Sequence, residues 1–276
     1  MEHQRTLMKS VFYSGVGLHS GKNVDISFNP ALNDQGIVFS RTDLDGAPKV
    51  IAKVSNVINT TRATTIGDGL AKVATVEHIL AALSVLGIDN CNIELSSIEP
   101  PVADGSALPF INLIKDAGIC ELNVQKKEPI IVKEALMVRD NDRFISVFPY
   151  DGFKITFTSV NTNPVIGAQF GEYEITEDIF IKELATARTI GFMHEIEALK
   201  KQGLALGGSL DNALVYDNEK ALNEPRFKDE LVRHKILDVV GDLSLIGRIK
   251  GHVVAVKSGH ELNIMLARKI IEKFGQ

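Results

Sequence analysis

Paired cysteines, long apolar runs and basic clusters are scarce or missing in this chain of 276 residues. Its two cysteines, Cys91 and Cys120, form neither a disulfide framework nor a Cys-x-x-Cys zinc motif. So few cysteines fit a reducing compartment, and we expect a cytoplasmic protein. The N-terminal MEHQRTLMKS lacks the apolar core of a signal peptide. No apolar run reaches the roughly 20 residues that span a bilayer, so any membrane contact is expected to be peripheral.

Basic residues are also fewer than acidic residues. The chain has 30 Lys and Arg against 35 Asp and Glu, which gives a formal net charge of −5, and it has no dense basic run. A nucleic-acid partner is therefore not expected. A local basic pocket for a phosphorylated small molecule stays compatible with this balance. The composition, with 45% hydrophobic and 24% charged residues, is typical of a globular protein of one large or two medium domains.

Hydrophobic periodicity predicts an α+β fold. The first half is expected to contain strands over 24–28, 36–40 and 90–95 and helices over 75–87 and 108–118. The second half is expected to contain strands over 130–138, 143–149, 153–160 and 252–257 and helices over 229–246 and 262–274. The segment QKKEP (125–129) between them is typical of a linker. We therefore expect two similar domains, 1–125 and 126–276, each a largely antiparallel sheet packed with helices. They would form a layered sandwich with the active site at the domain junction.

The predicted helix over 229–246 carries an unusual polar row. His234, Asp238 and Asp242 follow one another at steps of four, so they stack along one helical face. The other face is apolar. One interpretation is a half-exposed helix with an ordinary polar side. The other is a ligand row, since His234 and Asp238, one turn apart, suit two ligands of one metal ion.

A second candidate segment is TVEHIL (75–80), where Thr75 is the expected N-cap. Glu77 and His78 diverge by about 100° around the helix axis, yet both can reach one external point. Taken alone, such a pair is more often part of an exposed helix start than of a metal site. With His234 and Asp238, however, His78 would complete two imidazoles and a carboxylate, the donor set of a catalytic zinc with an open position. Asp242 would be one ligand too many for such a site, so it is better suited to orienting another residue.

Two loops supply further histidines. SGVGLHSGK (14–22) fails the spacings of the P-loop and of the dinucleotide-binding fingerprint, so a tight turn is expected, with His19 placed at its tip to contact a ligand. In KSGHELN (257–263), His260 follows a strand and precedes a helix. It is either structural or, beside a metal and an acidic residue, a proton donor.

Six segments together carry a family resemblance: GVGLHSGK, TVEHILAAL, LATARTIGF, LGGSLDNALV, RHKILDVVGDL and KSGHELN. They resemble the UDP-3-O-acyl-N-acetylglucosamine deacetylases, zinc enzymes of lipid A synthesis in Gram-negative bacteria. The similarity runs from about residue 3 to about residue 274. It implies Zn²⁺ as cofactor, a UDP-linked acylated N-acetylglucosamine as substrate and hydrolysis of its N-acetyl group. A monomer is expected.

The same resemblance implies three groups of site residues. The expected zinc ligands are His78, His234 and Asp238. The expected catalytic residues are Glu77 as general base, His260 as general acid, Asp242 as the carboxylate that holds this histidine, and Thr189 near the oxyanion. The expected substrate-binding residues are Lys235 beside the metal, Arg143 for the diphosphate, Phe192 at the acyl passage, and His19. One departure is Ile190, where an aromatic residue is expected in some relatives.

Two other functions stay open at this point. One is a zinc amidohydrolase that acts on a different N-acylated amino sugar. The other is a metal-free binding module that keeps only the fold. The second is disfavoured because Glu77 and the three expected ligands are all present.

Overall fold

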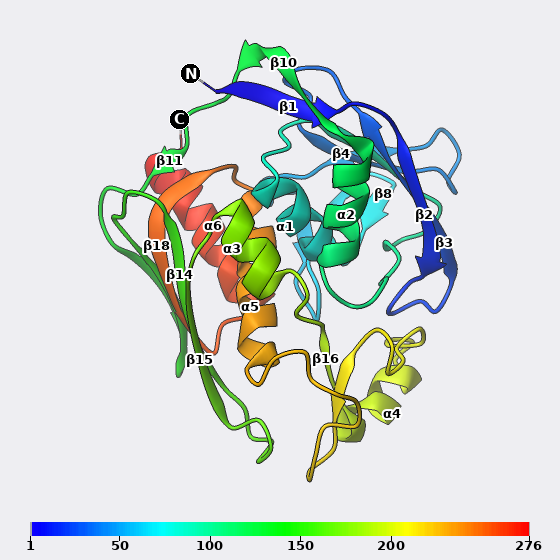
Figure 1. The fold of residues 1–276 in the computed structure, drawn as a ribbon, viewed down its shortest axis with the longest axis vertical. Helices are drawn as coiled ribbons and strands as arrows, with labels where there is room; N and C mark the ends of the chain where they lie inside the picture. The colour runs from blue at the N-terminus through cyan, green and yellow to red at the C-terminus, as the bar shows by residue number, and fades with distance from the viewer. Residues whose placement is uncertain (1, 276) are drawn as a thin grey trace.

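Two β-sheets form the outer layers of the fold, and helices lie between them (Figure 1). The structure is a computed structural model that describes residues 2–275. The first sheet contains, in spatial order, β2 (Val11–Val16), β3 (Asn23–Pro30), β9 (Cys91–Leu95), β4 (Ile37–Arg41) and β5 (Lys49–Ile51). The second contains β12 (Leu136–Asp140), β13 (Arg143–Phe148), β18 (Ile249–Val256), β14 (Phe153–Val160) and β15 (Ala168–Glu174), with β11 (Ile130–Ile131) also paired to β18.

Both sheets have the same topology. In each, the last strand in sequence, β9 or β18, lies in the middle of the sheet. It pairs in parallel with one neighbour, β4 or β14, and antiparallel with the other, β3 or β13. The remaining pairs in the two five-strand orders are antiparallel. This confirms the predicted α+β fold with largely antiparallel sheets. The division into domains at residue 125 stays a prediction.

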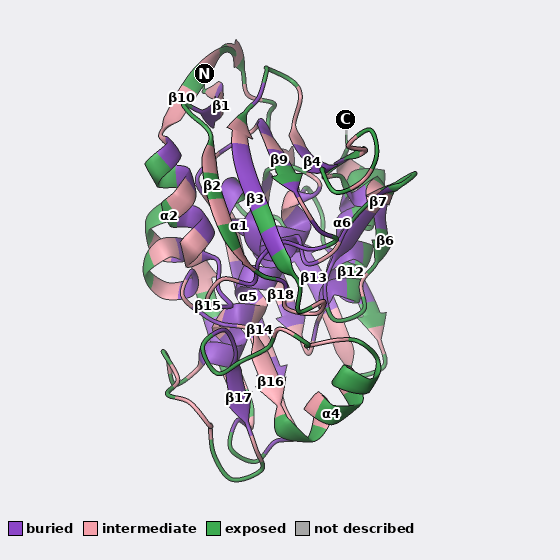
Figure 2. Ribbon diagram, turned by 90° about the vertical axis from the view of Figure 1, so that its right-hand side faces the viewer, coloured by how far each residue is buried: buried purple, intermediate pink, exposed green. Residues whose placement is uncertain are grey.

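Four helices form the layer between the sheets. They are α1 (Glu77–Val85), α2 (Leu108–Ala117), α5 (Glu230–Ser244) and α6 (His260–Phe274). Helix α5 contacts α1, α6, β14 and β15, so neighbours cover it on several sides. Figure 2 shows α5 as largely buried, and its polar row is buried together with its apolar face. The half-exposed helix considered from the sequence is therefore wrong.

Shorter elements complete the fold. β1 (His3–Leu7) pairs with β10 (Ile119–Gln125), and a small sheet contains β6 (Val57–Asn59), β7 (Thr65–Asp68) and β8 (Ala71–Val73). β16 (Ile190–Phe192), α4 (Met193–Lys201) and β17 (Leu214–Tyr216) lie together at the lower right of Figure 1. The short helical turns are η1 (Val54–Asn56), α3 (Glu177–Ile179) and η2 (Phe180–Leu184). Among the described residues, none of the helices combines the length and apolarity that crossing a bilayer requires.

Three local predictions need correction. The strand expected over 130–138 is two strands, because β11 pairs with β18 whereas β12 pairs with β13. The expected linker over 125–129 begins inside β10, which ends at Gln125. Thr75 is not the N-cap of α1: the cap is Val76. Thr75 has a φ of 55°, and its buried hydroxyl has no hydrogen-bond partner in the described part of the chain. The backbone N–H of Val76 is instead bonded to the carbonyl oxygen of Thr64, a tertiary contact that moves the start of the helix.

Candidate active site and metal centre

A close crossing of α1 and α5 builds the site. A Cβ added to Gly241 of α5 would lie 2.1 Å from the carbonyl oxygen of Glu77, at the start of α1. No side chain fits into that space, so glycine is what allows the two helices to touch. The crossing places Glu77 and His78, both buried, beside the polar row of α5.

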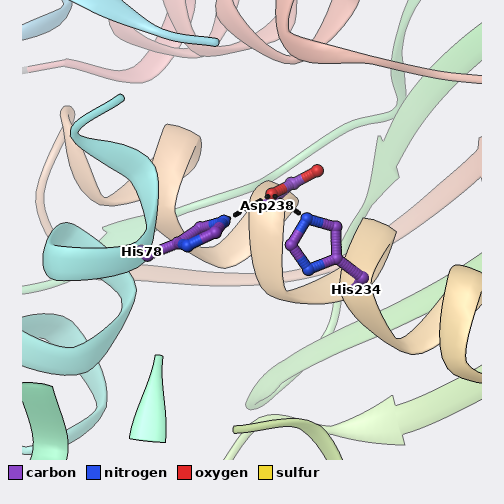
Figure 3. A group of neighbouring side chains, drawn as sticks. All are labelled: His78, His234 and Asp238. Carbon is purple, nitrogen blue, oxygen red and sulfur yellow. Dashed lines mark ion pairs between the residues drawn. The ribbon is translucent and has the colours of Figure 1, made fainter. Parts of the chain in front are cut away.

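Three of the predicted side chains converge at this crossing. His78 from α1 and His234 and Asp238 from α5 point toward one another (Figure 3), and their ligand atoms all lie within 4.8 Å of one another. The Nε2 atoms of His78 and His234 are 3.7 Å and 3.5 Å from Oδ1 of Asp238. That Oδ1 atom is buried and has no hydrogen-bond partner among residues 2–275. An unpaired buried carboxylate oxygen is costly unless a cation satisfies it, so the three residues fit a divalent metal ion.

The surroundings of His234 suit a metal ligand. Its Nδ1 lies 3.1 Å from the carbonyl oxygen of Ala187, so an N–H at Nδ1 donates there and the lone pair of Nε2 is directed at the cluster. Burial lowers the pKa of His234 to about 4, against the opposing effect of Asp238. The imidazole is therefore neutral near pH 7, which is the form that binds metals.

Asp238 is held in its ionised form. Burial alone would raise the pKa of this carboxyl, but His234, Lys235 and His260 together hold it well below its usual value. Nζ of Lys235 donates to the second oxygen, Oδ2, at 2.9 Å. One oxygen of Asp238 is thus paired with a lysine, and the other faces the two imidazoles. The carboxylate therefore has one oxygen directed at a shared cation position.

Two groups suited to proton transfer flank the cluster. Nε2 of His260 lies 3.9 Å from both Oε1 of Glu77 and Oδ2 of Asp238. Burial by itself would lower the pKa of His260, but Asp242, Glu77 and Asp238 raise it to about 10. Burial also raises the pKa of Glu77, with His260 and His78 opposing the change. A carboxylate with a raised pKa next to a protonated imidazole is an arrangement that can accept one proton and donate another.

Asp242 is the last residue of the polar row along α5, and it contacts His260. Its Oδ2 is 2.9 Å from Nδ1 of His260 and 2.8 Å from Nδ2 of Asn263, and its Oδ1 accepts a hydrogen bond from the hydroxyl of Thr64 at 2.5 Å. With an exposed fraction of 0%, the carboxylate is wholly enclosed by these donors. Asp242 lies outside the group formed by His78, His234 and Asp238 and contacts the ring of His260, and its role in holding that ring stays a prediction.

A cavity of about 630 Å³ opens over these residues. It is lined by the metal cluster and by Glu77 and His260. Five of the other predicted site residues also line it: Thr189, Lys235, Phe192, His19 and Arg143. Its apolar wall comes from β16, α4 and β17, with Ile190, Ile196, Leu199 and Val215. Phe192, the residue expected at the acyl passage, therefore lies on the same cavity as this apolar wall.

Arg143 and His19 lie at the outer parts of this cavity. Arg143 lines it while forming ion pairs with Asp140 and, at 3.4 Å, with Glu261. The loop of His19 is held by Glu99, a carboxylate 1% exposed that accepts the N–H of His19 at 3.0 Å. Burial lowers the pKa of His19, so a neutral ring faces the cavity at neutral pH. Both residues line the same cavity as His78, His234 and Asp238.

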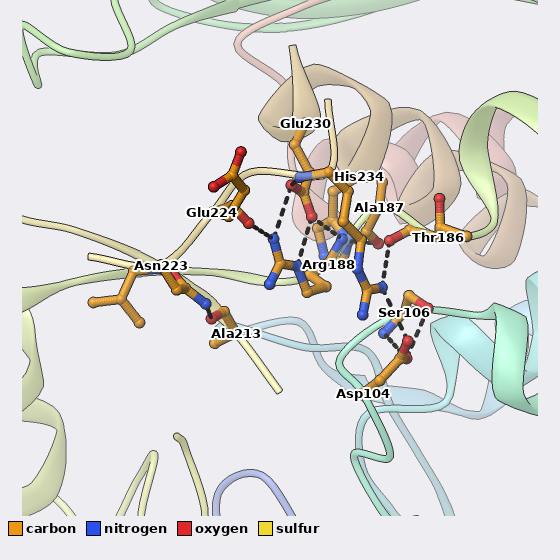
Figure 4. Close-up of polar contacts among 12 residues, drawn as sticks. Asp104, Ser106, Thr186, Ala187, Arg188, Ala213, Asn223, Glu224, Glu230 and His234 are labelled. Atoms are coloured by element: carbon orange, nitrogen blue, oxygen red, sulfur yellow. Dashed lines mark hydrogen bonds and ion pairs between the residues drawn. The ribbon is translucent and has the colours of Figure 1, made fainter. Parts of the chain in front are cut away.

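Four residues of the site had no recognisable signal in the sequence. Thr64 and Asn263 bind Asp242, as described above, and the other two are Arg188 and Glu230 (Figure 4). Arg188 donates from Nε to Glu230 at 2.8 Å, and both side chains are buried. This pair fixes the backbone next to Ala187, whose carbonyl oxygen contacts His234.

Comparison with known proteins places this geometry in a family. Residues 4–272 match the UDP-3-O-acyl N-acetylglycosamine deacetylase family, LpxC. The chain is 47% identical to UDP-3-O-acyl-N-acetylglucosamine deacetylase of Hahella chejuensis, with 99% of this chain and 92% of the relative covered. It is 44% identical to the protein of the same name from Geobacter sp., over 99% and 90%, and 45% identical to that from Acidithiobacillus ferrooxidans, over 98% and 90%. The chain therefore belongs to the UDP-3-O-acyl N-acetylglycosamine deacetylase family.

Proposed function

We propose that this protein is a zinc-dependent hydrolase that removes the N-acetyl group of UDP-3-O-acyl-N-acetylglucosamine. The products would be acetate and the UDP-3-O-acyl-glucosamine that enters lipid A synthesis. The observation that carries the proposal is the unpaired Oδ1 of Asp238, which faces two imidazoles in the same cavity as Glu77 and His260. Family membership and the names of the relatives support the substrate.

His78, His234 and Asp238 would hold the zinc, since two imidazoles and one carboxylate are a donor set that catalytic zinc uses. When bound, Zn²⁺ acts as a Lewis acid that makes water more nucleophilic near pH 7 and polarises a carbonyl. Imidazoles bind metals in their neutral form, so two of them and one ionised carboxylate would leave this position with a net positive charge once a divalent ion is bound. That charge favours the approach of an amide oxygen.

The protons would be handled by residues of this chain. Glu77 accepts the proton of the attacking water, because burial has raised the pKa of its carboxyl. His260, charged and held by Asp242, donates a proton to the departing amine of the sugar. Thr189, which lines the cavity, supplies a hydroxyl near the developing oxyanion. The two roles follow from the pKa values: the raised pKa of Glu77 suits a group that accepts a proton, and the raised pKa of His260 suits a group that carries one to donate.

The cavity suits an amphipathic nucleotide sugar. Arg143 and Lys235 provide positive charge for a diphosphate, because guanidinium and ammonium groups bind phosphate oxygens well. Phe192 and the apolar wall of α4 and β17 suit an acyl chain, and each buried methylene stabilises the complex by roughly 0.8 kcal/mol. His19 would contact the substrate from the loop that Glu99 holds. A rival substrate, another N-acylated amino sugar, would need neither the diphosphate nor the acyl contacts.

An assay of acetate release tests the proposal. Zinc-loaded protein is expected to deacetylate UDP-3-O-acyl-N-acetylglucosamine much faster than UDP-N-acetylglucosamine or an uncharged acylated amino sugar. Glu77→Gln keeps the shape of the side chain but cannot accept a proton, so kcat should fall roughly 10²-fold or more while the metal stays bound. A zinc-loaded protein that releases no acetate from the acylated nucleotide sugar would refute the proposed function.

We also propose that the protein works as a cytoplasmic monomer with two domains, 1–125 and 126–276, that contribute α1 and α5 to one site. Peripheral membrane contact is the most that this assignment allows. Light scattering after gel filtration and fractionation of cells measure these properties directly. A stable dimer or recovery in the integral membrane fraction would contradict it.

A further inference from the structure

Thr64 links the two proton-transfer groups of the site through three hydrogen bonds. It lies directly before β7 and is 0% exposed. Its carbonyl oxygen accepts the N–H of Val76 at 3.3 Å, which ties it to the start of α1. Its own N–H donates to Oε2 of Glu77 at 3.1 Å, and its hydroxyl donates to Oδ1 of Asp242 at 2.5 Å. One residue thus contacts the carboxylate of the proposed base and the carboxylate behind the proposed acid.

The hydroxyl bond matters because of where Asp242 is placed. Its Oδ2 accepts from His260 and Asn263, whereas within residues 2–275 the hydroxyl of Thr64 is the one hydrogen-bond donor to Oδ1. Both ends of the carboxylate must be held for its plane, and hence the direction of the bond to His260, to be fixed. Without the hydroxyl, the carboxylate is held through Oδ2 alone, by His260 and Asn263, and rotation about its Cβ–Cγ bond is less restricted. The ring of His260 would then lose its fixed direction toward Glu77 and the metal cluster.

Threonine suits this task better than other small residues. Its β-branched side chain restricts the χ1 rotamer, so the hydroxyl is held in place before the bond forms. Serine keeps the donor with less restriction, and valine keeps the shape without the donor. Thr64 and Asp242 are both 0% exposed, so water cannot replace the missing hydroxyl at low cost. The site therefore provides two substitutions that separate the hydrogen bond from the shape.

We infer that Thr64 is a positioning residue for the deacetylation: its hydroxyl orients Asp242, and through it His260, while its N–H orients Glu77. The inference rests on the proposed function, in which Glu77 and His260 transfer the protons. A purely structural residue would affect folding alone. A positioning residue affects the rate of the bound complex, kcat, with little change in KM.

The test compares Thr64→Val, Thr64→Ser and Thr65→Val in steady-state acetate release, with the zinc content and melting temperature of each protein measured. Thr65, the next residue, is the matched control, because it is also buried and no hydrogen bond from its hydroxyl is present in the described chain. Thr64→Val should lower kcat roughly ten- to hundred-fold, which is what one hydrogen bond to a charged group is worth. KM should change less than about two-fold, Thr64→Ser should keep most of the activity, and Thr65→Val should match the wild type. If Thr64→Val does not fold, Thr64→Cys, with a weaker donor, should lower kcat to an intermediate value.

Three results would overturn the inference. They are an unchanged kcat in Thr64→Val despite a lower melting temperature, an equal loss in Thr64→Ser, and an equal loss in Thr65→Val. Glu77→Gln, measured in parallel, separates this failure from that of the proposed function. If Glu77→Gln is inactive and Thr64→Val is fully active, only the role of Thr64 is refuted. If Glu77→Gln is as active as the wild type, the assignment of the base is refuted as well.

Discussion

The buried pair of Arg188 and Glu230 gives the most quantitative prediction. Glu230 is 0% exposed and accepts the N–H of Arg188 at 3.0 Å, Nε of its guanidinium at 2.8 Å and the N–H of Arg226 at 2.6 Å. Nη2 of Arg188 also donates to the carbonyl oxygen of Glu224 at 2.7 Å (Figure 4). Replacing Glu230 by Gln keeps the volume but leaves the guanidinium buried without its counter-charge. Breaking a buried pair in this way costs about 3–5 kcal/mol.

The loss of stability in Glu230→Gln should depend on pH in a defined direction. Burial would raise the pKa of Glu230, but its hydrogen bonds to Arg188 and Arg226 lower it overall. A group with a lowered folded pKa contributes stability that is present above its unfolded pKa, near 4.3, and lost as the pH falls through the folded value. The stability difference between wild type and Glu230→Gln should therefore be largest near neutral pH and shrink in acid.

Denaturant unfolding at pH 7 and at pH 4 measures both effects. The control is Glu177→Gln, since Glu177 forms an exposed ion pair with Lys115 at 3.0 Å, a kind of pair that contributes about 1 kcal/mol or less. If Glu230→Gln unfolds within about 1 kcal/mol of the wild type at pH 7, the buried pair does not stabilise the segment beside His234 as argued. A difference that grows in acid would contradict the sign.

Two further predictions concern the helix crossing and the rim of the cavity. Gly241→Ala places a Cβ where the carbonyl oxygen of Glu77 now lies, so it should lower both the melting temperature and kcat; a stable, fully active variant would show that α1 and α5 need not touch there. Arg143→Ala should raise KM for the UDP-linked substrate with little change in kcat, which steady-state kinetics measures, and an unchanged KM would remove Arg143 from the diphosphate site.

Local spacing predicted part of the site before any tertiary information. The step of four between His234 and Asp238 requires a shared helical face, and α5 confirms that face over its whole length. Glu77 and His78 were correctly placed at the start of a helix. That His78 would meet α5 depends on Gly241, whose importance is visible only once two helices approach each other. The family resemblance supplied that convergence, which periodicity alone does not contain.

The elements that were missed have weak local signals. β1 and β10 pair with each other across more than a hundred residues, and their stability comes from that pairing rather than from their own pattern. Thr64 and Asn263 are ordinary polar residues in the sequence, and only their distance to Asp242 reveals a role. The expected N-cap at Thr75 failed for the same reason, because a backbone bond between Val76 and Thr64 sets the start of α1. In each of these cases the local structure depends on contacts between residues that are far apart in the sequence.

The most direct test of the account is a metal analysis of the purified protein combined with anomalous diffraction at the zinc edge. We expect about one zinc per chain, bound to His78, His234 and Asp238, together with loss of deacetylation on chelation and its return when zinc is added. Rigorously metal-free protein with full activity, or a zinc ion bound away from these three side chains, would contradict it.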